Sequence, residues 1–309
     1  MILRFSALLL CLVLSVLACG PFSALPKQKL SLAVQPTLSS ADMLEKAKPI
    51  EQFLESRLPE VDVEIYVPLS QAGVIEALRF GQAQIAFMSA WPAQLATDLA
   101  GADLALAEVR EVIIDGKKVE APSYYSSWVV LKESAVKTLP ETKGKRACFP
   151  SAISTSGYVA PIGRMVELGV LSKPENGSAD ATKFFSEVRF GGGYQQCWEA
   201  LKAGQVDVSV IAGDVSEKLY NEVLAATRAI ESQGPIPSHG VVISKELKEP
   251  LRSRAISAVQ DLGTQKDLMR GFISSIFVRF EPTTAEKHLG SLRGYLSRAG
   301  LSFTERVGK

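Results

Sequence analysis

A loop of hydroxyl residues and glycine, Ser154-Thr155-Ser156-Gly157-Tyr158, has the composition of an anion-binding loop. It follows the apolar run Ala147-Cys148-Phe149 and precedes a predicted helix that continues to Leu168. A loop between a strand and a helix gathers free backbone N–H groups, hydroxyl donors and the positive end of a helix dipole at one point. Ser and Thr are also favoured N-cap residues, so an ordinary helix start is the alternative interpretation.

Residues suited to catalysis or metal binding are sparse. The two histidines, His239 and His288, have no nucleophile and orienting acid at a recognisable spacing. Ser154 and Ser156 lack the Gly-x-Ser-x-Gly nucleophile elbow. Two cysteines and two distant histidines match no metal-ligand spacing. We therefore expect no enzyme, no metal and no other cofactor.

The first 18 residues are typical of an export signal. They carry Arg4, an apolar core and the small residue Ala18, and they are too short for a durable membrane span. Val16-Leu17-Ala18-Cys19 resembles a bacterial lipobox, in which Cys19 becomes the lipid-modified first residue of the mature chain. The alternative is a plain signal cut near Ala18 or Ala24. We expect a signal peptide over 1–18, a lipidated flexible leader over 19–28, and a lipoprotein facing the periplasm or cell exterior.

Composition indicates an ordinary folded protein beyond the signal. The chain is 47% hydrophobic and 22% charged, with a formal net charge of +1. Removing residues 1–18 leaves equal numbers of basic and acidic residues, because only Arg4 is lost. A balanced charge does not favour a nucleic-acid partner. We expect a monomer with a small-molecule ligand.

Two cysteines, Cys148 and Cys197, remain after the signal and Cys19 are set aside. In an oxidising compartment, leftover thiols often pair. Cys148 ends a predicted strand and Cys197 lies in the first turn of a predicted helix, so a disulfide is within reach. Two buried thiols, or a thiol pair that binds a soft ligand, are the alternatives.

The segment from residue 30 to residue 92 alternates between strand-like and helical patterns. The predicted strands and helices are Leu30–Val34, Ala41–Leu58, Val61–Val67, Val74–Phe80 and Gln84–Met88. This βαβαβ order predicts a mostly parallel sheet with helices on both faces. Ligands of such sheets lie beyond the carboxyl ends of strands, where Pro36-Thr37, Ser89 and Trp91 are found.

A second α/β series follows and predicts a second lobe. Its elements are two strand segments within Leu104–Ile114, a long strand Tyr124–Leu131, strands at 145–149, 187–190 and 206–211, and helices ending at Leu168 and Lys202. The chain is expected to cross back near Gly234-Pro235-Ile236-Pro237, with His239 in that crossing and His288 on a solvated helix. Lobe 1 would then comprise 29–126 and 238–309, and lobe 2 would comprise 127–237. Two crossings make a hinge with a cleft between the lobes.

With these elements placed, the chain resembles the phosphonate/phosphite/phosphate-type substrate-binding proteins of ABC importers over residues 30–260. Lys143-Gly144-Lys145-Arg146-Ala147 before Ser154-Thr155-Ser156-Gly157-Tyr158 is the most specific part. The other three matching segments are Ile75 to Phe87, Tyr125-Ser126-Ser127 with the strand after it, and Gly192-Gly193-Tyr194 with Ala200 to Asp207. Gln84, Tyr194 and Gln195 depart from the family pattern.

The resemblance implies a two-lobed periplasmic-binding-protein-like fold of type II. Its lobes would close on a tetrahedral oxyanion, with Ser154, Thr155 and Ser156 binding the anionic head and Tyr125 reaching the same group. Fixed amide and hydroxyl donors at a helix end can hold an anion without Lys or Arg. Gln195 could not supply the acid that holds the ammonium group of aminoalkyl phosphonates in some relatives.

Four further residues are candidates for the same site, each with an alternative. Asp214 could accept a hydrogen bond from a protonated oxyanion, or it could be a solvated N-cap. Tyr194 could contact the ligand or pack against the hinge. Trp91 could face the cleft or belong to the core, and Ser89 is similar.

Transport is the leading functional hypothesis. The protein would deliver a phosphorus oxyanion to the permease and ATPase subunits of an ABC importer. The alternative is an oxyanion sensor that signals through a membrane histidine kinase and that could bind arsenic oxyanions. A reduced Cys148 and Cys197 pair could ligate arsenite in that case.

Overall fold

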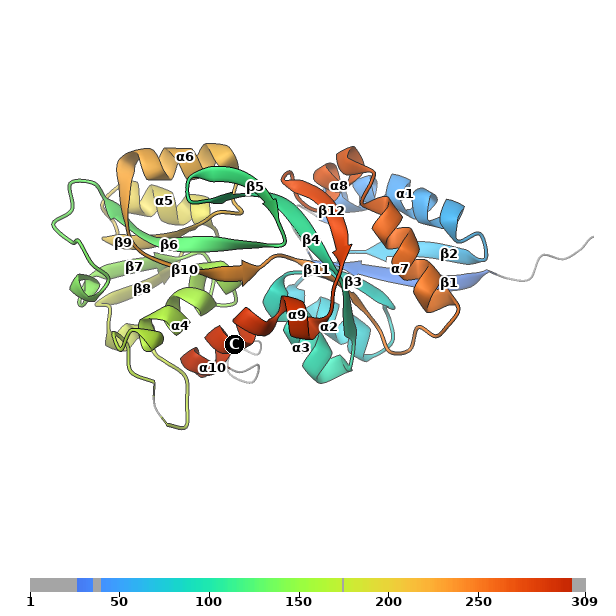
Figure 1. Ribbon diagram of the computed structural model, residues 1–309, viewed down its shortest axis with the longest axis horizontal. Coiled ribbons are helices and arrows are strands. Elements are labelled where there is room, and N and C mark those ends of the chain that lie inside the picture. The colour runs from blue at the N-terminus through green and yellow to red at the C-terminus, as the bar shows by residue number, and fades with distance from the viewer. Residues whose placement is uncertain (1–26, 36–39, 174, 302–309) are drawn as a thin grey trace, which may run out of the picture.

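The computed structural model describes residues 27–35, 40–173 and 175–301 (Figure 1). The expected signal peptide, the lipidation site Cys19 and the Pro36-Thr37 strand end lie outside the described residues. Within them, no helix is both long enough and apolar enough to cross a bilayer. The first strand starts at Gln28, two residues before the predicted Leu30.

Lobe 1 is built on a seven-stranded sheet. Its spatial order is β12 (Phe277–Pro282), β4 (Asp103–Ile114), β11 (Gly240–Ile243), β3 (Ile85–Met88), β1 (Gln28–Val34) and β2 (Val61–Tyr66), with β5 (Lys117–Ala121) paired to β4. β1 pairs in parallel with β2 and β3, whereas all pairs made by β4 and β11 are antiparallel. The parallel pairing predicted for the βαβαβ segment is therefore confirmed in β1, β2 and β3, but the lobe 1 sheet as a whole is mixed. β11 starts next to the end of β3, since Gly240 pairs with Met88, because the chain returns there from lobe 2. It therefore runs antiparallel to β3.

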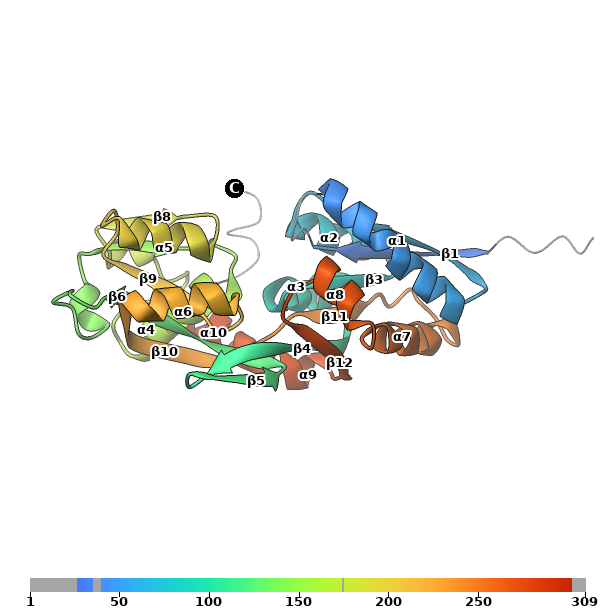
Figure 2. The same ribbon diagram turned by 90° about the horizontal axis from the view of Figure 1, so that it is seen from above.

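Helices cover both faces of this sheet (Figures 1 and 2). They are α1 (Ser40–Arg57), α2 (Gln71–Arg79), α3 (Ala90–Ala100), α7 (Leu251–Leu262), α8 (Lys266–Phe272) and α9 (Ala285–His288). Alternation along β1 sends Leu32 into the core under α1, α7 and α8, and Ala33 into the core under α2 and α3. Helices α1 and α2 confirm the sequence prediction, but α3 was not predicted.

Lobe 2 is built on a five-stranded mixed sheet. Its order is β10 (Thr227–Pro237), β6 (Ser123–Leu131), β9 (Val208–Ala212), β7 (Arg146–Phe149) and β8 (Glu187–Phe190). Its helices are α4 (Ala160–Glu167), α5 (Tyr194–Lys202) and α6 (Glu217–Ala226), with short helical turns at Pro140–Thr142, Thr155–Val159 and Ala181–Lys183. Only β7–β8 and β7–β9 are parallel, because β6 and β10 carry the chain into and out of the lobe.

Two crossings between the lobes lie side by side. The Ser238 backbone N–H, in the return crossing, donates to the Pro122 carbonyl of the first crossing at 2.9 Å. Figure 2 shows β4, β5 and β10 on one side of the molecule, where they join the lobes. The two hinge segments expected from the sequence are therefore adjacent.

The helix α10 (Gly290–Ala299) makes a further connection and corrects the expected division of the chain. Residues 238–309 were assigned to lobe 1, but α10 packs on α4 of lobe 2, so closely that a Cβ at Gly163 would lie 2.9 Å from the Tyr295 carbonyl oxygen. At the same time Arg293 Nε donates to Gln94 Oε1 of α3 at 2.7 Å. The apolar face formed by Leu292, Tyr295 and Ala299 is buried there. α10 therefore contacts both lobes.

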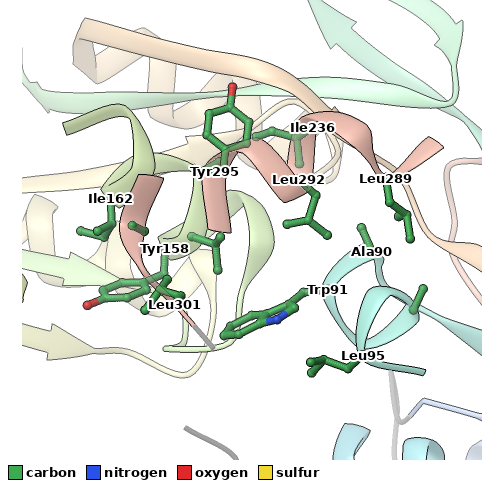
Figure 3. Packing of buried hydrophobic residues seen from close by; sticks show 14 of the residues in the cluster. Ala90, Trp91, Leu95, Tyr158, Ile162, Ile236, Leu289, Leu292, Tyr295 and Leu301 are labelled. Carbon is green, nitrogen blue, oxygen red and sulfur yellow. The ribbon is translucent and has the colours of Figure 1, made fainter. Parts of the chain in front are cut away.

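The core beside α10 includes Trp91, which was a candidate ligand-binding residue. Trp91 is 2% exposed and belongs to a core cluster that contains residues of α3, α10 and lobe 2. Figure 3 shows it among side chains that include Leu95, Leu292 and Leu301. Its position two residues into α3 turns the indole into the core, which was the alternative interpretation.

Candidate functional site

One cavity of about 250 Å³ is lined by both lobes. It contains six of the predicted site residues, namely Ser89, Ser154, Thr155, Ser156, Tyr194 and Asp214. Residues that the sequence analysis did not assign to the site also line it, among them Gln35, Tyr124, Pro150 and His239. The lining residues include no Lys or Arg among those that the structure describes.

The hydroxyl loop forms the lobe 2 wall of this cavity. Ser154 caps the turn Thr155–Val159, and its Oγ accepts from the Gly157 N–H at 3.0 Å. Gly157 leaves no room for a side chain, because a Cβ would lie 2.6 Å from Pro150 Cγ and 2.8 Å from Ser154 Oγ. The glycine therefore permits the close approach that orients the Ser154 hydroxyl.

Ser156 belongs to a chain of three hydroxyl groups. Its Oγ lies 2.7 Å from the Tyr194 hydroxyl and 3.2 Å from the Tyr124 hydroxyl. Burial raises the pKa of both tyrosines, so each remains a neutral hydroxyl at physiological pH. Such a chain can supply hydrogen-bond donors to an anion without any charged group.

Thr155 differs from its neighbours because its hydroxyl has no partner among the residues that the structure describes. The residue is 7% exposed, lines the cavity, and its Oγ1 is buried without a hydrogen bond. An unsatisfied buried hydroxyl costs about 1–3 kcal/mol. A ligand oxygen in the cavity would give this hydroxyl the partner that the protein does not.

Three helix starts lie at the cavity, and their N–H groups and dipoles favour an anion there. Ser89 and Ala90 begin α3 on the lobe 1 side, Thr155 and Ser156 begin the turn that continues into α4, and Tyr194 begins α5. The first N–H groups of a helix have no intrahelical partner, and the helix dipole is positive there. The cavity can therefore attract an anion without a lining cation.

The lobe 1 wall is a small network of neutral groups. The Ser89 N–H donates to Gln35 Oε1 at 2.7 Å, so this end of the Gln35 amide is the oxygen. The other end, Nε2, is therefore a donor, and it donates to His239 Nδ1 at 3.4 Å. The neutral imidazole then carries its proton on Nε2. Burial lowers the pKa of His239 well below its ordinary value, so this ring stays neutral.

Asp214 is a carboxylate that lines the cavity, and it forms an ion pair with Arg110, which lies outside the cavity. Its side chain is 12% exposed, and Arg110 Nη1 donates to its Oδ2 at 2.9 Å. Burial raises the pKa of Asp214, while Arg110 and the Tyr124 hydroxyl oppose that rise. The solvated N-cap alternative was wrong, because Ser216 caps α6.

Two expected placements need correction. Tyr125 does not line the cavity and is 40% exposed, whereas Tyr124 is buried and lines it. Successive side chains of a strand point to opposite faces of the sheet, so Tyr124 faces the cavity and Tyr125 faces away from it. The sequence-based assignment therefore named the wrong tyrosine of the pair. His239 lies in the return crossing as expected, but His288 is half-buried and its Nε2 lies 3.0 Å from the Ser238 carbonyl oxygen.

A disulfide joins Cys148 and Cys197, whose Cα atoms are 5.4 Å apart. It connects the end of β7, just before the hydroxyl loop, to the first turn of α5, just after Tyr194. Both sulfurs are used in this bond, so the alternative of a thiol pair that binds a soft ligand does not apply to the oxidised protein. In the described part of the chain, no group of three or more His, Cys, Asp or Glu is placed to hold a metal.

Similarity to solved structures agrees with the two-lobed architecture. The structure matches a binding protein component of an ABC phosphonate transporter (PA3383) from Pseudomonas aeruginosa with a TM-score of 0.64 and 19% identity, covering 90% of this chain and 92% of that one. It also matches XAC2383 from Xanthomonas citri bound to ATP, with a TM-score of 0.68, 15% identity and coverage of 89% and 98%. PhnD1 from Prochlorococcus marinus in complex with methylphosphonate gives a TM-score of 0.65, 15% identity and coverage of 88% and 98%.

Sequence comparison extends the likeness beyond the fold. The phosphate-import protein PhnD of Mycolicibacterium smegmatis is 28% identical over 181 residues, which are 58% of this chain and 54% of that protein. The chain thus matches about half the length of this relative. The model of the family described as "ABC transporter, phosphonate, periplasmic substrate-binding protein" matches residues 32–288. The chain therefore belongs to the periplasmic substrate-binding protein family of phosphonate ABC transporters.

Proposed function

We propose that this protein captures a small phosphorus oxyanion of the phosphonate, phosphite or phosphate class outside the cytoplasmic membrane and delivers it to an ABC permease and ATPase. The observation that carries the proposal is the buried Thr155 hydroxyl, which lies beside the hydroxyls of Ser154 and Ser156 and has no hydrogen-bond partner within the described part of the chain. A tetrahedral oxyanion presents several acceptor oxygens to such a set of donors. The relatives that bind methylphosphonate or import phosphate support this class of ligand.

The size of the cavity favours a small ligand. Its volume of about 250 Å³ lies below the range of roughly 300–1,000 Å³ that drug-sized ligands occupy. A nucleotide such as the ATP bound by the Xanthomonas relative is much larger than phosphate or methylphosphonate. The helix starts and hydroxyls would hold the phosphorus-bound oxygens, and the apolar lining residues Ala90, Ile153 and Pro237 suit a hydrogen or methyl substituent.

Asp214 gives the site a hydrogen-bond acceptor as well as donors. An ionised carboxylate cannot donate, so it is matched by a ligand oxygen that carries a proton. Singly protonated phosphate and methylphosphonate have such an oxygen, whereas sulfate at neutral pH does not. We propose that Asp214 accepts this proton and that sulfate is discriminated against.

The site is poorly suited to aminoalkyl phosphonates. Gln195 is exposed, hydrogen-bonds Glu199 Oε1 at 2.8 Å, and does not line the cavity. Asp214 is already engaged by Arg110. An ammonium group in the cavity would therefore have no free carboxylate among the described lining residues.

Attachment to the membrane through Cys19 completes the proposal. The Val16-Leu17-Ala18-Cys19 sequence suits lipid modification after cleavage, and the family works outside the cytoplasmic membrane. Replacement of Cys19 by alanine should move the protein from the membrane fraction to the soluble extracytoplasmic fraction. Unchanged membrane association would contradict the lipid anchor and leave ligand capture unaffected.

Calorimetry with the purified protein tests the ligand class. We expect binding of phosphate, phosphite or methylphosphonate, and much weaker binding of sulfate and 2-aminoethylphosphonate. Thr155→Val should weaken binding of the preferred ligand, while Ser127→Ala, which alters an exposed pair with Ser232 on β6 and β10, serves as the matched control. Absence of binding by all three phosphorus anions would refute the proposal.

A further inference from the structure

Arg110 occupies an unusual position directly behind the cavity. It lies on β4 of lobe 1, its side chain is 4% exposed, and it does not line the cavity. Nη1 donates to Asp214 Oδ2 at 2.9 Å, and Nη2 donates to Glu108 Oε2 at 3.0 Å. Because Asp214 follows β9 of lobe 2, this pair joins the two lobes behind the cavity.

The groups that face Asp214 come from several elements. They are Arg110 on β4, Tyr124 on β6 and Tyr194 at the start of α5, and beyond Arg110 lie Glu108 and His239. The tyrosines and His239 are neutral, so Arg110 is the cation among these groups. Burial alone would lower the pKa of Arg110, but Glu108 and Asp214 outweigh that effect and raise it, which keeps the guanidinium charged.

The charge of Asp214 decides which ligand form fits. An ionised Asp214 only accepts hydrogen bonds, so it suits an oxyanion that keeps one proton. A protonated Asp214 can donate, so it suits a fully deprotonated oxyanion. Since a buried carboxylate without a counter-charge takes up a proton, the state of Asp214 depends on the cation behind it.

We infer that Arg110 is a specificity-determining positioning residue, which keeps Asp214 ionised and thereby makes the site select the singly protonated form of its oxyanion. Arg110 acts through Asp214 and touches no ligand. The inference rests on the proposed capture of a phosphorus oxyanion. It goes further by assigning the choice of protonation state to a residue outside the cavity.

The test compares pH profiles of phosphate and methylphosphonate affinity in the wild-type protein, Arg110→Gln, Arg110→Lys and Asp214→Asn. Above the second pKa of methylphosphonate, which removes its last acidic proton, wild-type affinity for this ligand should fall by about tenfold per pH unit, because the competent fraction falls in that proportion. Phosphate still carries one proton above its own second pKa, so its wild-type affinity should not fall there. Arg110→Gln and Asp214→Asn should both lose the fall in methylphosphonate affinity, since each replaces the ionised acceptor with a donor. Arg110→Lys keeps the charge and should keep the wild-type profile.

The outcomes separate the two proposals. If the wild-type protein binds neither anion at any pH, the proposed function fails. If it binds and Arg110→Gln weakens affinity equally at all pH values, Arg110 is only structural and the inference fails. If Arg110→Gln does not fold, Asp214→Asn decides, because a wild-type profile in that variant also overturns the inference. Arg146→Gln, which breaks the partly exposed pair with Asp207 away from the cavity, is the matched control and should leave the profile unchanged.

Discussion

The two walls of the cavity are built on different principles. The lobe 2 wall is rich in hydroxyls, is braced by the Cys148–Cys197 disulfide, and contains the unsatisfied Thr155. The lobe 1 wall is an amide and imidazole network in which Gln35 joins Ser89 to His239. Lobe 2 therefore holds donors that need a ligand, whereas the lobe 1 groups are already engaged. The two walls therefore differ in how much hydrogen-bonding capacity they have left for a ligand.

The largest effect is expected from removing the brace of the lobe 2 wall. The Cys148→Ala/Cys197→Ala protein should lose about 2–4 kcal/mol of unfolding free energy, because the disulfide constrains the unfolded chain. Urea unfolding of the ligand-free protein measures this loss, with the reduced wild-type protein as the comparison. An unchanged unfolding midpoint would show that lobe 2 does not depend on the disulfide.

Thr155→Val tests whether the lobe 2 wall contains a donor reserved for the ligand. Binding should weaken by about 1–3 kcal/mol, since the ligand oxygen loses its partner in a buried site. The ligand-free protein should be as stable as wild type or more stable, because the variant removes an unsatisfied hydroxyl. Ser156→Ala is the contrasting variant and should destabilise the ligand-free protein, since Tyr124 and Tyr194 lose a partner. Equal stability losses in both variants would remove the distinction between them.

Acid should act on the lobe 1 side. Burial lowers the pKa of His239 and His288 in the folded protein, so their contribution to stability is present above the ordinary value of about 6.5 and is lost as pH falls below it. The loss is at most about 1.4 kcal/mol per pH unit for each proton taken up. Asp214 acts in the opposite direction, because its raised pKa favours folding at low pH and that contribution disappears as pH rises.

Thermal unfolding of the ligand-free protein between pH 7.5 and pH 5.5 measures this dependence. The unfolding temperature should fall toward acid in the wild-type protein and fall less in His239→Gln/His288→Gln. A double variant as acid-sensitive as the wild-type protein would assign the effect to other groups.

A small effect is expected for Ser89→Ala on the lobe 1 wall. The Ser89 side chain makes no capping hydrogen bond, and the contact with Gln35 uses its backbone N–H, which alanine retains. The binding free energy should change by about 0.5 kcal/mol or less. A calorimetric loss comparable to that of Thr155→Val would mean that the two walls contribute equally.

The smallest effect should come from Tyr125→Phe, which is expected to leave affinity unchanged because this side chain lies away from the cavity. Tyr124→Phe is the matched variant and should weaken binding, since its hydroxyl contacts Ser156. Calorimetry on both proteins would show which tyrosine belongs to the site. The reverse order of effects would restore the sequence-based assignment.

Local patterns in the sequence were sufficient to predict much of the architecture. Hydrophobic periodicity located α1, β1 and β2, and the hydroxyl loop was recognisable because its residue types are those of a helix start. These features depend on neighbours in the chain. They therefore do not require knowledge of which distant segments meet.

Contacts between distant segments were decided only by the tertiary structure. Which of two adjacent tyrosines faces the cavity depends on the orientation of β6, and the burial of Trp91 depends on α10 crossing to lobe 2. The pairing of Arg110 with Asp214 joins residues 104 positions apart, and sequence spacing contains no signal for it. Such contacts are fixed by the packing of several elements around the same residues. The sequence therefore indicated the hydroxyl donors of the site but not the pairing of Arg110 with Asp214 and Glu108 behind the cavity.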